Sequence, residues 1–380
     1  MPLTFALLFA LIFFAVGLYL PFWPVWLSAK GLSADTIGLF LAVGAWLRIL
    51  VVPLLGRFAD RRGGVRPTIM ALALTAAAAF ALAPLADLPA LLLTVQLTAV
   101  LPLLGLIPLA DAAAMAAVGR GRLDYGRARL WGSIAFIAAA WGGGWAIGAS
   151  GVSPLPWALA ACALGIAGAA ILLERPQPQP RTPGQREGLA VILRYPRLLA
   201  GMAGASLLQG SHALYYGFAT LAWQAAGFSD QLIGLLWAIG VVAEVVLFAL
   251  ARYGLDRWPP HRLFALAAGA AVVRWSGMAL VTAPLPLAGL QCLHAFTFGA
   301  AHLGALRFIA ATAPPGAAAT AQTVYSALSG GLAMGGLLYL AGGWYASFGA
   351  GAFFAMAAVA AVGFLTTIAP LPHGGDKVAP

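Results

Sequence analysis

Long apolar stretches follow one another along almost the whole chain, separated by short loops in which arginines gather. Hydrophobic residues make up 62% of the 380 residues and charged residues only 8%, whereas a soluble domain carries about 25% charged residues. A chain of this composition cannot cover a water-facing surface. Each stretch of about 20 apolar residues is long enough to cross a bilayer as a helix. The sequence therefore predicts an all-α integral membrane protein.

Cutting the sequence at charges, prolines and glycines gives twelve candidate transmembrane helices. They lie at roughly 3–27, 35–56, 67–87, 89–117, 127–149, 153–173, 198–226, 230–252, 262–282, 285–313, 318–346 and 350–370. Arginines concentrate in alternate loops, as expected of loops on the cytoplasmic side. An even number of spans then places both termini in the cytoplasm. The net charge of +10 is explained by this topology, so we expect no nucleic acid as a partner.

The spans fall into two groups on either side of a charged, proline-rich connection. We expect an N-terminal six-helix bundle at 1–174, a cytoplasmic linker at 175–197, a C-terminal six-helix bundle at 198–370 and a disordered tail at 371–380. Four prolines near the start of the linker preclude a continuous helix there. The rest of the linker can form a short amphipathic helix along the membrane surface. The scarcity of lysine beside many arginines suggests a bacterial protein, and hence the inner membrane.

The second half of the chain nearly repeats the first with a shift of 196 residues. Ile37-Gly38-Leu39 recurs as Ile233-Gly234-Leu235, and Asp60-Arg61 recurs as Asp256-Arg257. Repeats of this kind build transporters from two similar bundles, related here by an axis along the membrane normal. The repeat differs at its intramembrane charges, because Arg48 falls opposite Glu244 and Asp111 falls opposite Arg307.

The loop after the second span contains Gly56, Asp60, Arg61, Gly63 and Arg66. With these residues it resembles the signature loop of the major facilitator superfamily. Asp60 can bind a helix N-terminus or an arginine, and Gly63 permits a tight turn. We expect these residues to form a conformational gate, and we add Asp111 and Arg129 to it. The alternative is a solvated loop that only sets topology.

Five charged residues lie in the interior of the predicted spans, away from the span ends: Arg48, Asp111, Glu244, Arg274 and Arg307. An isolated charge in hydrocarbon costs several kcal/mol, so each is expected to face a partner or a wet cavity. Arg48 and Asp111 can neutralise one another, and Glu244, Arg274 and Arg307 can form a network. Purely structural ion pairing remains open beside a functional role.

A carboxylate and two histidines are candidates for proton coupling. Glu244 is the only glutamate inside a predicted span; burial disfavours its ionised form and a nearby arginine such as Arg274 favours it. His294 and His302 share a helix face with Phe298 between them, and histidine titrates near neutral pH. We expect proton coupling to involve Glu244, Arg274, His294 and His302. The alternative is that the histidines are hydrogen-bonded helix contacts.

Aromatic residues accompany the buried charges. An aromatic cavity with an arginine suits an aromatic carboxylate, because rings stack on its body and a guanidinium pairs its acid group. The alternative is the interfacial belt of aromatic residues. The predicted substrate-binding residues are Arg48, Tyr19, Trp23, Gln209, His212, Tyr215, Tyr216, Trp237 and Phe298.

Over nearly its full length the chain resembles a symporter of the major facilitator superfamily, and within it the phenylpropionate permease group. The resemblance is carried by 20–27 (LPFWPVWL), 123–133 (LDYGRARLWGS), 215–218 (YYGF), 241–246 (VVAEVV), 272–275 (VVRW) and 301–308 (AHLGALRF). The chain is more distantly similar to the lactose permease group, whose coupling glutamate, arginine and histidine find counterparts in Glu244, Arg274 and His294. The glutamate one turn after that histidine is absent, and Thr297 stands three residues after His294.

The resemblance implies a secondary active transporter that imports a small aromatic carboxylate with protons by alternating access. It implies a monomer among membrane lipids, with a proton gradient as the energy source and neither cofactor nor metal. A sugar or nucleoside symporter and a drug exporter are alternatives with the same fold. A membrane enzyme would need clustered catalytic acids or a nucleophile with its base, and the sequence shows neither at a membrane edge. A non-transporting sensor is the remaining alternative.

Overall fold

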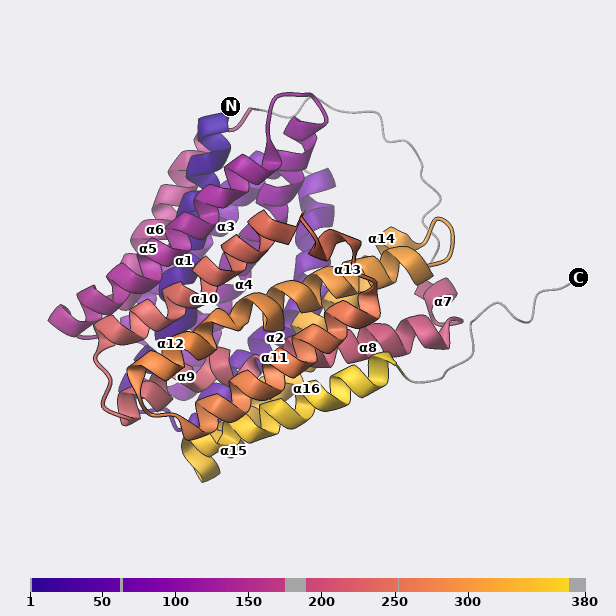
Figure 1. Cartoon of the computed structure of the whole chain (residues 1–380). Coiled ribbons are helices and arrows are strands. Elements are labelled where there is room, and N and C mark those ends of the chain that lie inside the picture. Colours follow the sequence, from indigo (N-terminus) through magenta and orange to yellow (C-terminus); the bar gives the residue numbers. More distant parts are fainter. Residues whose placement is uncertain (1, 62–63, 175–188, 252, 369–380) are drawn as a thin grey trace, which may run out of the picture. The chain divides into compact units, whose positions relative to one another are not determined.

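The structure is a computed structural model and describes residues 2–61, 64–174, 189–251 and 253–368 (Figure 1). Within these ranges the chain is helical throughout, which confirms the predicted fold class. The first half contains α1 (Pro2–Ala29), α2 (Ala34–Arg61), α3 (Val65–Leu82), the 3-10 turn η1 (Ala83–Leu85), α4 (Pro89–Val118), α5 (Tyr125–Ser150) and α6 (Leu155–Ile171).

The second half is more often interrupted. It begins with α7 (Leu189–Ile192), α8 (Pro196–Gly210), α9 (Ala213–Ala225), α10 (Asp230–Ala251), the 3-10 turn η2 (Leu255–Arg257) and α11 (Pro260–Leu280). It continues with α12 (Pro284–Cys292), the π-helical segment η3 (Ala295–Ala300), α13 (Ala301–Thr312), α14 (Ala318–Ser326), the π-helical segment η4 (Ala327–Ala333), α15 (Met334–Phe348), the 3-10 turn η5 (Gly349–Ala352) and α16 (Phe353–Thr367).

Nine helical segments of the described chain are long and apolar enough to cross a membrane, and α6 is a shorter apolar helix. One of the nine, Ala318–Thr367, contains two helical stretches separated at η5. The pair α8 and α9 forms a further stretch, interrupted at Ser211 and His212. The described helices therefore fit the twelve predicted spans. The predicted tail at 371–380 and most of the linker lie outside the described residues.

Equivalent turns join the first two spans of each half. Gly31 joins α1 to α2 with φ +85°, and Gly227 joins α9 to α10 with the same angle. Glycine is the residue that adopts this conformation without strain. The two glycines are also 196 residues apart, so the repeat in the sequence is matched by a repeat in backbone geometry.

The chain forms two compact units: Met1–Gln179 with Tyr216–Val241, and Pro180–Tyr215 with Val242–Pro380. In the first unit α1 packs against α5 and α6, and α3 packs against α4 and α6. In the second unit α11 lies beside α13 and α16, and α8 packs against α13 and α16 (Figure 1). The segment 216–241 groups with the first unit, so the bundle boundaries expected from the sequence stay a prediction.

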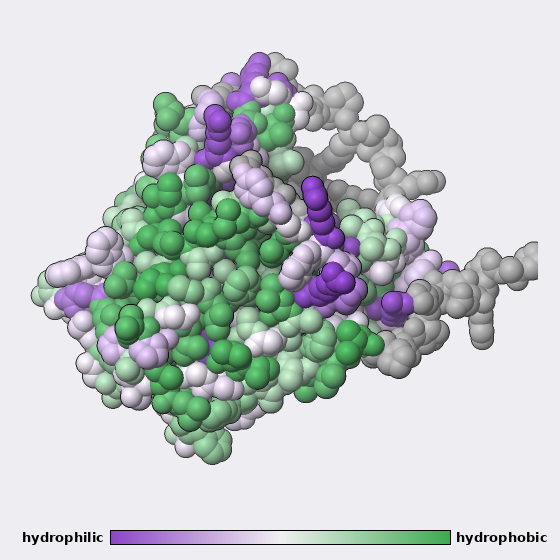
Figure 2. Space-filling model, viewed as in Figure 1, coloured by the Kyte–Doolittle hydropathy of each residue, from purple (hydrophilic) through white to green (hydrophobic). Residues whose placement is uncertain are grey.

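Large hydrophobic side chains cover much of the face seen in Figure 2. Exposed examples in the first unit include Trp141, Trp145 and Trp157, and in the second unit Leu285 and Phe354. An outer surface of this kind suits the acyl chains of lipids, which cannot satisfy polar groups. Charged side chains are concentrated near helix ends, where they can reach the polar interface.

Helices in the second unit approach closely where glycines face one another. A Cβ added at Gly204 in α8 would overlap the carbonyl group of Gly363 in α16, and one added at Gly363 would overlap the backbone of α8. Small residues permit such contacts between membrane helices. This contact fixes α16 against α8 and so helps to hold the unit together.

Gly204→Ala should lower the stability of the purified protein in detergent by about 1–3 kcal/mol, because the methyl group overpacks the contact with α16. Gly269→Ala in α11 is the control, since a Cβ there has open space and alanine favours the helix. Thermal unfolding of both variants measures the difference. Equal melting temperatures for the two variants would show that the contact contributes nothing.

Candidate functional site

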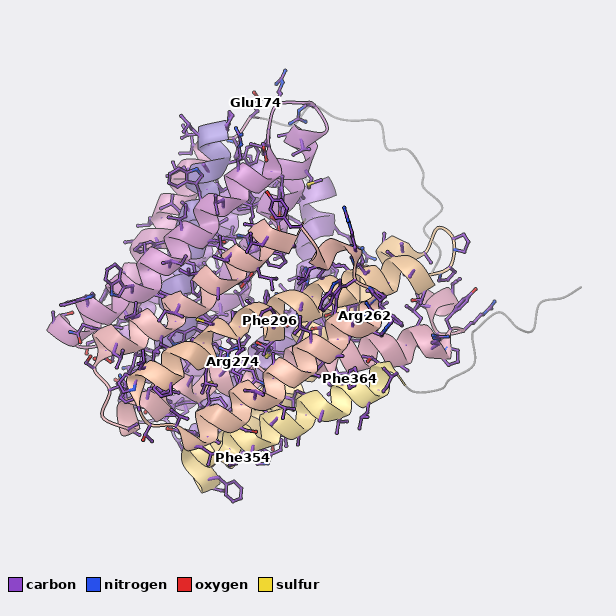
Figure 3. The ribbon with its side chains drawn as sticks, in the orientation of Figure 1. Glu174, Arg262, Arg274, Phe296, Phe354 and Phe364 are labelled. Atoms are coloured by element: carbon purple, nitrogen blue, oxygen red, sulfur yellow. The ribbon has the colours of Figure 1, made fainter. Side chains whose placement is uncertain are left out.

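The second unit buries the guanidinium of Arg274, which is 0% exposed in α11 (Figure 3). Its Nη1 donates to Nδ1 of His294 at 2.9 Å and to Oγ1 of Thr297 at 3.0 Å. Its Nη2 donates to Oε1 of Gln291 at 2.8 Å. The rings of Tyr215 and Trp275 lie 4.6 Å from the guanidinium carbon, close enough for cation–π attraction. The charge is therefore surrounded by acceptors and aromatic faces.

The bond from Arg274 fixes the form of His294. An arginine carries only donors, so Nδ1 of His294 has to accept, and the ring proton is on Nε2. That Nε2 lies 3.7 Å from Oε2 of Glu244 in α10. Glu244 is partly exposed, at 23%, whereas the His294 side chain is at 7%. Arg274, His294 and Glu244 thus form a row in which a neutral imidazole separates a buried cation from a more accessible carboxylate.

His212 lies at the interruption between α8 and α9 and is 0% exposed. Its Nδ1 is 3.0 Å from the carbonyl oxygen of Gln209, which can only accept, so Nδ1 carries a proton. Its Nε2 is 3.0 Å from Oγ1 of Thr297. Trp275, which follows Arg274 in α11, bonds to the same interruption: its Nε1 donates to Oγ of Ser211 at 3.1 Å. Thr297 therefore contacts both His212 and Arg274.

The π-helical segment η3 carries Thr297 and Phe298. Side-chain Nε2 of Gln209 donates to the carbonyl oxygen of Phe298 at 3.2 Å, so a residue of α8 bonds the backbone within the irregular turn. Irregular backbone inside a membrane protein needs such partners, and π-helical turns are frequent at functional sites. Gln209, predicted to bind substrate, is engaged here with the backbone of η3.

His302 lies one turn beyond Phe298 and outside the polar cluster. The rings of His294 and Phe298 stack with centroids 5.4 Å apart, and those of Phe298 and His302 stack at 6.2 Å. The shared face predicted from the sequence is therefore present. Phe298 separates the two histidines, and an apolar ring cannot pass a proton.

The first unit contains Arg48 in α2 and Tyr19 in α1, whose charge and hydroxyl interact electrostatically. Nε of Arg48 is buried and has no hydrogen-bond partner among the described residues. The expected pairing of Arg48 with Asp111 is wrong, since no ion pair within the described part of the chain joins them. Asp111 instead accepts a hydrogen bond from the hydroxyl of Tyr125 at 3.0 Å. The two side chains come from helices α4 and α5, which meet near their ends.

Trp23 is fully buried in the first unit. Its Nε1 donates to Oε1 of Gln96 at 3.2 Å, and Nε2 of Gln96 donates to the carbonyl oxygen of Phe40 at 2.9 Å. Trp26 stacks on the Trp23 ring with centroids 4.7 Å apart, and Phe80 contacts its edge. These contacts connect α1, α2, α3 and α4 and are those of a packing residue.

The remaining aromatic candidates lie in separate groups. Tyr216 stacks on Trp237 with centroids 6.3 Å apart, and Nε1 of Trp237 donates to Thr220 at 3.0 Å. Both belong to the segment that groups with the first unit. Tyr215, its neighbour in sequence, lies under Arg274 in the second unit.

The predicted gate residues are only partly described. Gly63 and the side chains of Asp60 and Arg61 lie outside the described residues, and a Cβ at Gly56 would meet open space. Nη1 of Arg66 donates to the carbonyl oxygen of Leu173 at 3.2 Å, connecting the start of α3 to the end of α6. Arg129 lies over the ring of Phe13, 3.7 Å from its centroid. The gate itself stays a prediction.

Sequence reasoning missed several members of the Arg274 cluster. Gln291 and Ser211 were not singled out, and Thr297 was noted only as a replacement for a glutamate. Arg307 was expected in the network, but its Nη1 donates to the carbonyl oxygen of Trp258. Polar residues inside apolar spans were the available signal, and Gln291 and Ser211 carry it. The positions of polar residues along the sequence do not show which of these residues face Arg274.

The comparisons with known proteins agree with this architecture. Residues 3–368 match the model of the MFS_1 like family. The chain belongs to the major facilitator superfamily. It is 37% identical over 362 residues to a protein of Escherichia coli (strain K12) named "Probable 3-phenylpropionic acid transporter", covering 92% of each chain. It is 29% identical over 336 residues to the maltose permease of Geobacillus stearothermophilus, covering 87% of this chain and 84% of that one.

Solved structures of the superfamily share the fold. The nucleoside transporter NupG aligns with a TM-score of 0.84 at 16% identity, covering 97% of this chain and 98% of that one. A D-xylose-proton symporter aligns with a TM-score of 0.72 at 15% identity, covering 100% and 99%. The chain is therefore a multi-span membrane transporter with a small-molecule substrate, from a family of transporters and not of enzymes.

Trp23→Phe should lower stability by about 1–3 kcal/mol, because Oε1 of Gln96 loses its buried donor, and should leave the KM of transport unchanged. Trp157→Phe is the matched control, since Trp157 is 53% exposed in α6 of the same unit. Thermal unfolding and substrate uptake are measured on the same preparations. A raised KM with unchanged stability would assign Trp23 to the substrate instead.

Proposed function

We propose that this superfamily member imports a small aromatic carboxylate such as 3-phenylpropionate together with protons across the bacterial inner membrane. The observation that carries the proposal is the row formed by Arg274, His294 and Glu244 in the second unit. A buried cation, a neutral imidazole and a partly exposed carboxylate provide a site where a proton can be held and released. The name of the Escherichia coli relative supports the class of substrate.

Glu244 is the proposed proton carrier. His294 accepts from Arg274 at Nδ1, so an additional proton on that nitrogen would first require this bond to break. Glu244 is the more accessible of the two side chains, and at 23% exposure its carboxylate can reach water. Nε2–H of His294 faces the carboxylate and favours its ionised form, whereas burial favours the protonated form. A modest change in the exposure of Glu244 to water can therefore shift the balance between its ionised and its protonated form.

Arg48 is the proposed partner of the substrate carboxylate. Its guanidinium is held in the first unit beside Tyr19, and its buried Nε has no acceptor among the described residues. A carboxylate can supply that acceptor and form a charge-assisted pair. Tyr19 would then contact the aromatic body of the substrate.

Coupling follows from the charges. Protonated Glu244 removes a negative charge that would repel an incoming carboxylate, so protonation favours substrate loading. Release of the substrate and of the proton on the cytoplasmic side completes import by alternating access. The protein acts as a monomer with both termini in the cytoplasm, and the gate formed by Gly56, Asp60, Arg61, Gly63 and Arg66 with Asp111 and Arg129 closes that side. The proton gradient is the energy source, without a cofactor.

A sugar is the second candidate substrate, because the maltose permease of Geobacillus stearothermophilus aligns with most of the chain. A neutral sugar needs hydrogen bonds to its hydroxyl groups and no cation. Thermal unfolding of the purified protein with 3-phenylpropionate and with maltose distinguishes the two candidate substrates, because a bound substrate raises the melting temperature.

Glu244→Gln should abolish accumulation of labelled 3-phenylpropionate driven by an imposed pH gradient, because the amide cannot release a proton. Exchange of internal for external substrate should persist. Glu174→Gln is the control, since Glu174 is exposed and pairs with Arg122 near the end of α6. The measurement uses proteoliposomes. Gradient-driven accumulation by Glu244→Gln would remove Glu244 from the coupling step.

Arg48→Gln should raise the KM for 3-phenylpropionate by about 10- to 100-fold, the effect of losing about 1.5–3 kcal/mol from a hydrogen bond to a charged group. Arg122→Gln, which removes an exposed arginine of the same unit, should leave KM unchanged. The neutral analogue 3-phenylpropanol should compete poorly with the acid in the parent protein. Equal competition by the alcohol would contradict recognition of a carboxylate.

A further inference from the structure

Thr297 is the one side chain that contacts both His212 and Arg274 among the hydrogen bonds of the described cluster. Its Oγ1 lies 3.0 Å from Nε2 of His212 and 3.0 Å from Nη1 of Arg274. It also lies 3.4 Å from the carbonyl oxygen of His294. A hydroxyl has one proton and two lone pairs. With three neighbours around it, the direction of that proton depends on which neighbours are donors.

The donor roles around Thr297 can be assigned in sequence. Arg274 donates, so it occupies one lone pair of Oγ1. His212 already uses its Nδ1–H on the carbonyl oxygen of Gln209, so neutral His212 has a lone pair at Nε2. Two acceptors compete for the Thr297 hydroxyl proton, Nε2 of His212 at 3.0 Å and the carbonyl oxygen of His294 at 3.4 Å. The shorter contact favours donation to His212. The two histidines consequently hold opposite tautomers, Nδ1–H on His212 and Nε2–H on His294.

We propose that Thr297 is a positioning residue: its hydroxyl donates to Nε2 of His212 and accepts from Nη1 of Arg274, which holds Arg274 on His294, so that His294 presents Nε2–H to Glu244. This inference rests on the proposed function only for its effect on coupling. The tautomer assignment stands on the hydrogen bonds alone. Gln209 of α8 and Ser211 at the interruption after it complete the arrangement, because Gln209 bonds Phe298 within η3 and Ser211 accepts from Trp275.

The position of Thr297 depends on irregular backbone in two helices. It lies within the π-helical segment η3, and His212 lies at the interruption between α8 and α9. Thr297 is 1% exposed and His212 is 0% exposed, so the hydroxyl and its imidazole partner are both buried. Valine has nearly the shape of threonine but no hydroxyl, whereas serine keeps it.

The groups that titrate or carry charge around Thr297 come from every side of the cluster. They are Glu244 from α10, Arg274 from α11, His294 next to η3, and His212 and Tyr215 from the interrupted helix. Without the Thr297 acceptor, Nη1 of Arg274 loses one of the two acceptors described above and keeps His294. We expect the guanidinium to turn towards the carboxylate of Glu244, which favours the ionised carboxylate and moves the pH dependence of uptake.

The first test is spectroscopic and does not require transport. In protein labelled with 15N at histidine and reconstituted in lipid, the ring nitrogens report the tautomer of each histidine, assigned with single His→Asn variants. We expect Nδ1–H on His212 and Nε2–H on His294 near neutral pH, and a changed Nε2 resonance of His212 in Thr297→Val. Nε2–H on His212, or an unchanged spectrum in Thr297→Val, would overturn the proposal.

The second test measures proton-driven uptake of 3-phenylpropionate as a function of pH. In Thr297→Val the pH of half-maximal uptake should move down by about one unit, the lower end of the effect of an approaching opposite charge on a carboxylate. Thr297→Ser should restore the parent profile. Thr312→Val is the matched control, because its hydroxyl bonds only Phe308 within the same helix.

The histidine spectra and the pH profiles separate the role of Thr297 from the proposed role of Glu244 as proton carrier. If Glu244→Gln still accumulates substrate, the proposed proton carrier is wrong, and the histidine spectra still decide the role of Thr297. If the spectra are as expected but the pH profiles of Thr297→Val and Thr297→Ser are equal to that of the parent, the hydroxyl does not position Arg274 for coupling. A loss of stability in Thr297→Val is recognised by comparison with Thr312→Val.

Discussion

The second unit depends on one burial, that of the Arg274 guanidinium. A buried cation without partners costs many kcal/mol, so the surrounding helices have to supply acceptors at fixed positions. Gln291 and His294 come from one side, Thr297 from the next turn, and Tyr215 and Trp275 provide aromatic faces. These groups stabilise the guanidinium of Arg274. Their bonds to it also fix their own orientation.

The helices around the cluster are irregular at His212 and just beyond His294. In an ideal α-helix residues three or four positions apart share a face, and His294 and Thr297 use that spacing to reach the same nitrogen of Arg274. The π-helical segment beginning at Ala295 changes the backbone register just beyond His294. The backbone group this exposes is bonded by Gln209.

The sequence was sufficient for the fold and for the charged members of the site, because both depend on patterns along one chain. Apolar runs, arginine-rich loops and the repeat predicted helices in two halves. Glu244, Arg274 and His294 were predicted together, from their positions inside apolar spans and from a resemblance, and the structure brings them together. The partners were less predictable. Arg48 was expected to pair with Asp111, but Tyr125 is closer to that carboxylate, and the facing residues of packed helices are not encoded in the spacing along either helix.

The two halves share a scaffold and differ in chemistry. The glycines that join the first two helices of each half, Gly31 and Gly227, have the same backbone conformation. The same shift carries the cluster residues of the second half onto apolar or small residues of the first: Arg274 onto Ala78, His212 onto Val16 and Thr297 onto Leu101. The polar cluster therefore belongs to the second unit. The first unit has Arg48 at the position that the shift of 196 residues aligns with Glu244.

A protein with an acid in one unit and a base in the other can divide two tasks that conflict at a single site. A carboxylate that takes up a proton needs an environment in which its charge is only weakly favoured, whereas a guanidinium that binds an anionic substrate needs to stay charged. In the second unit, Arg274 donates to Nδ1 of His294, and Nε2 of the same ring lies 3.7 Å from the carboxylate of Glu244. The asymmetry of the repeat thus gives one half a carboxylate where the other half has a guanidinium, as the proposed division between proton exchange and anion recognition requires.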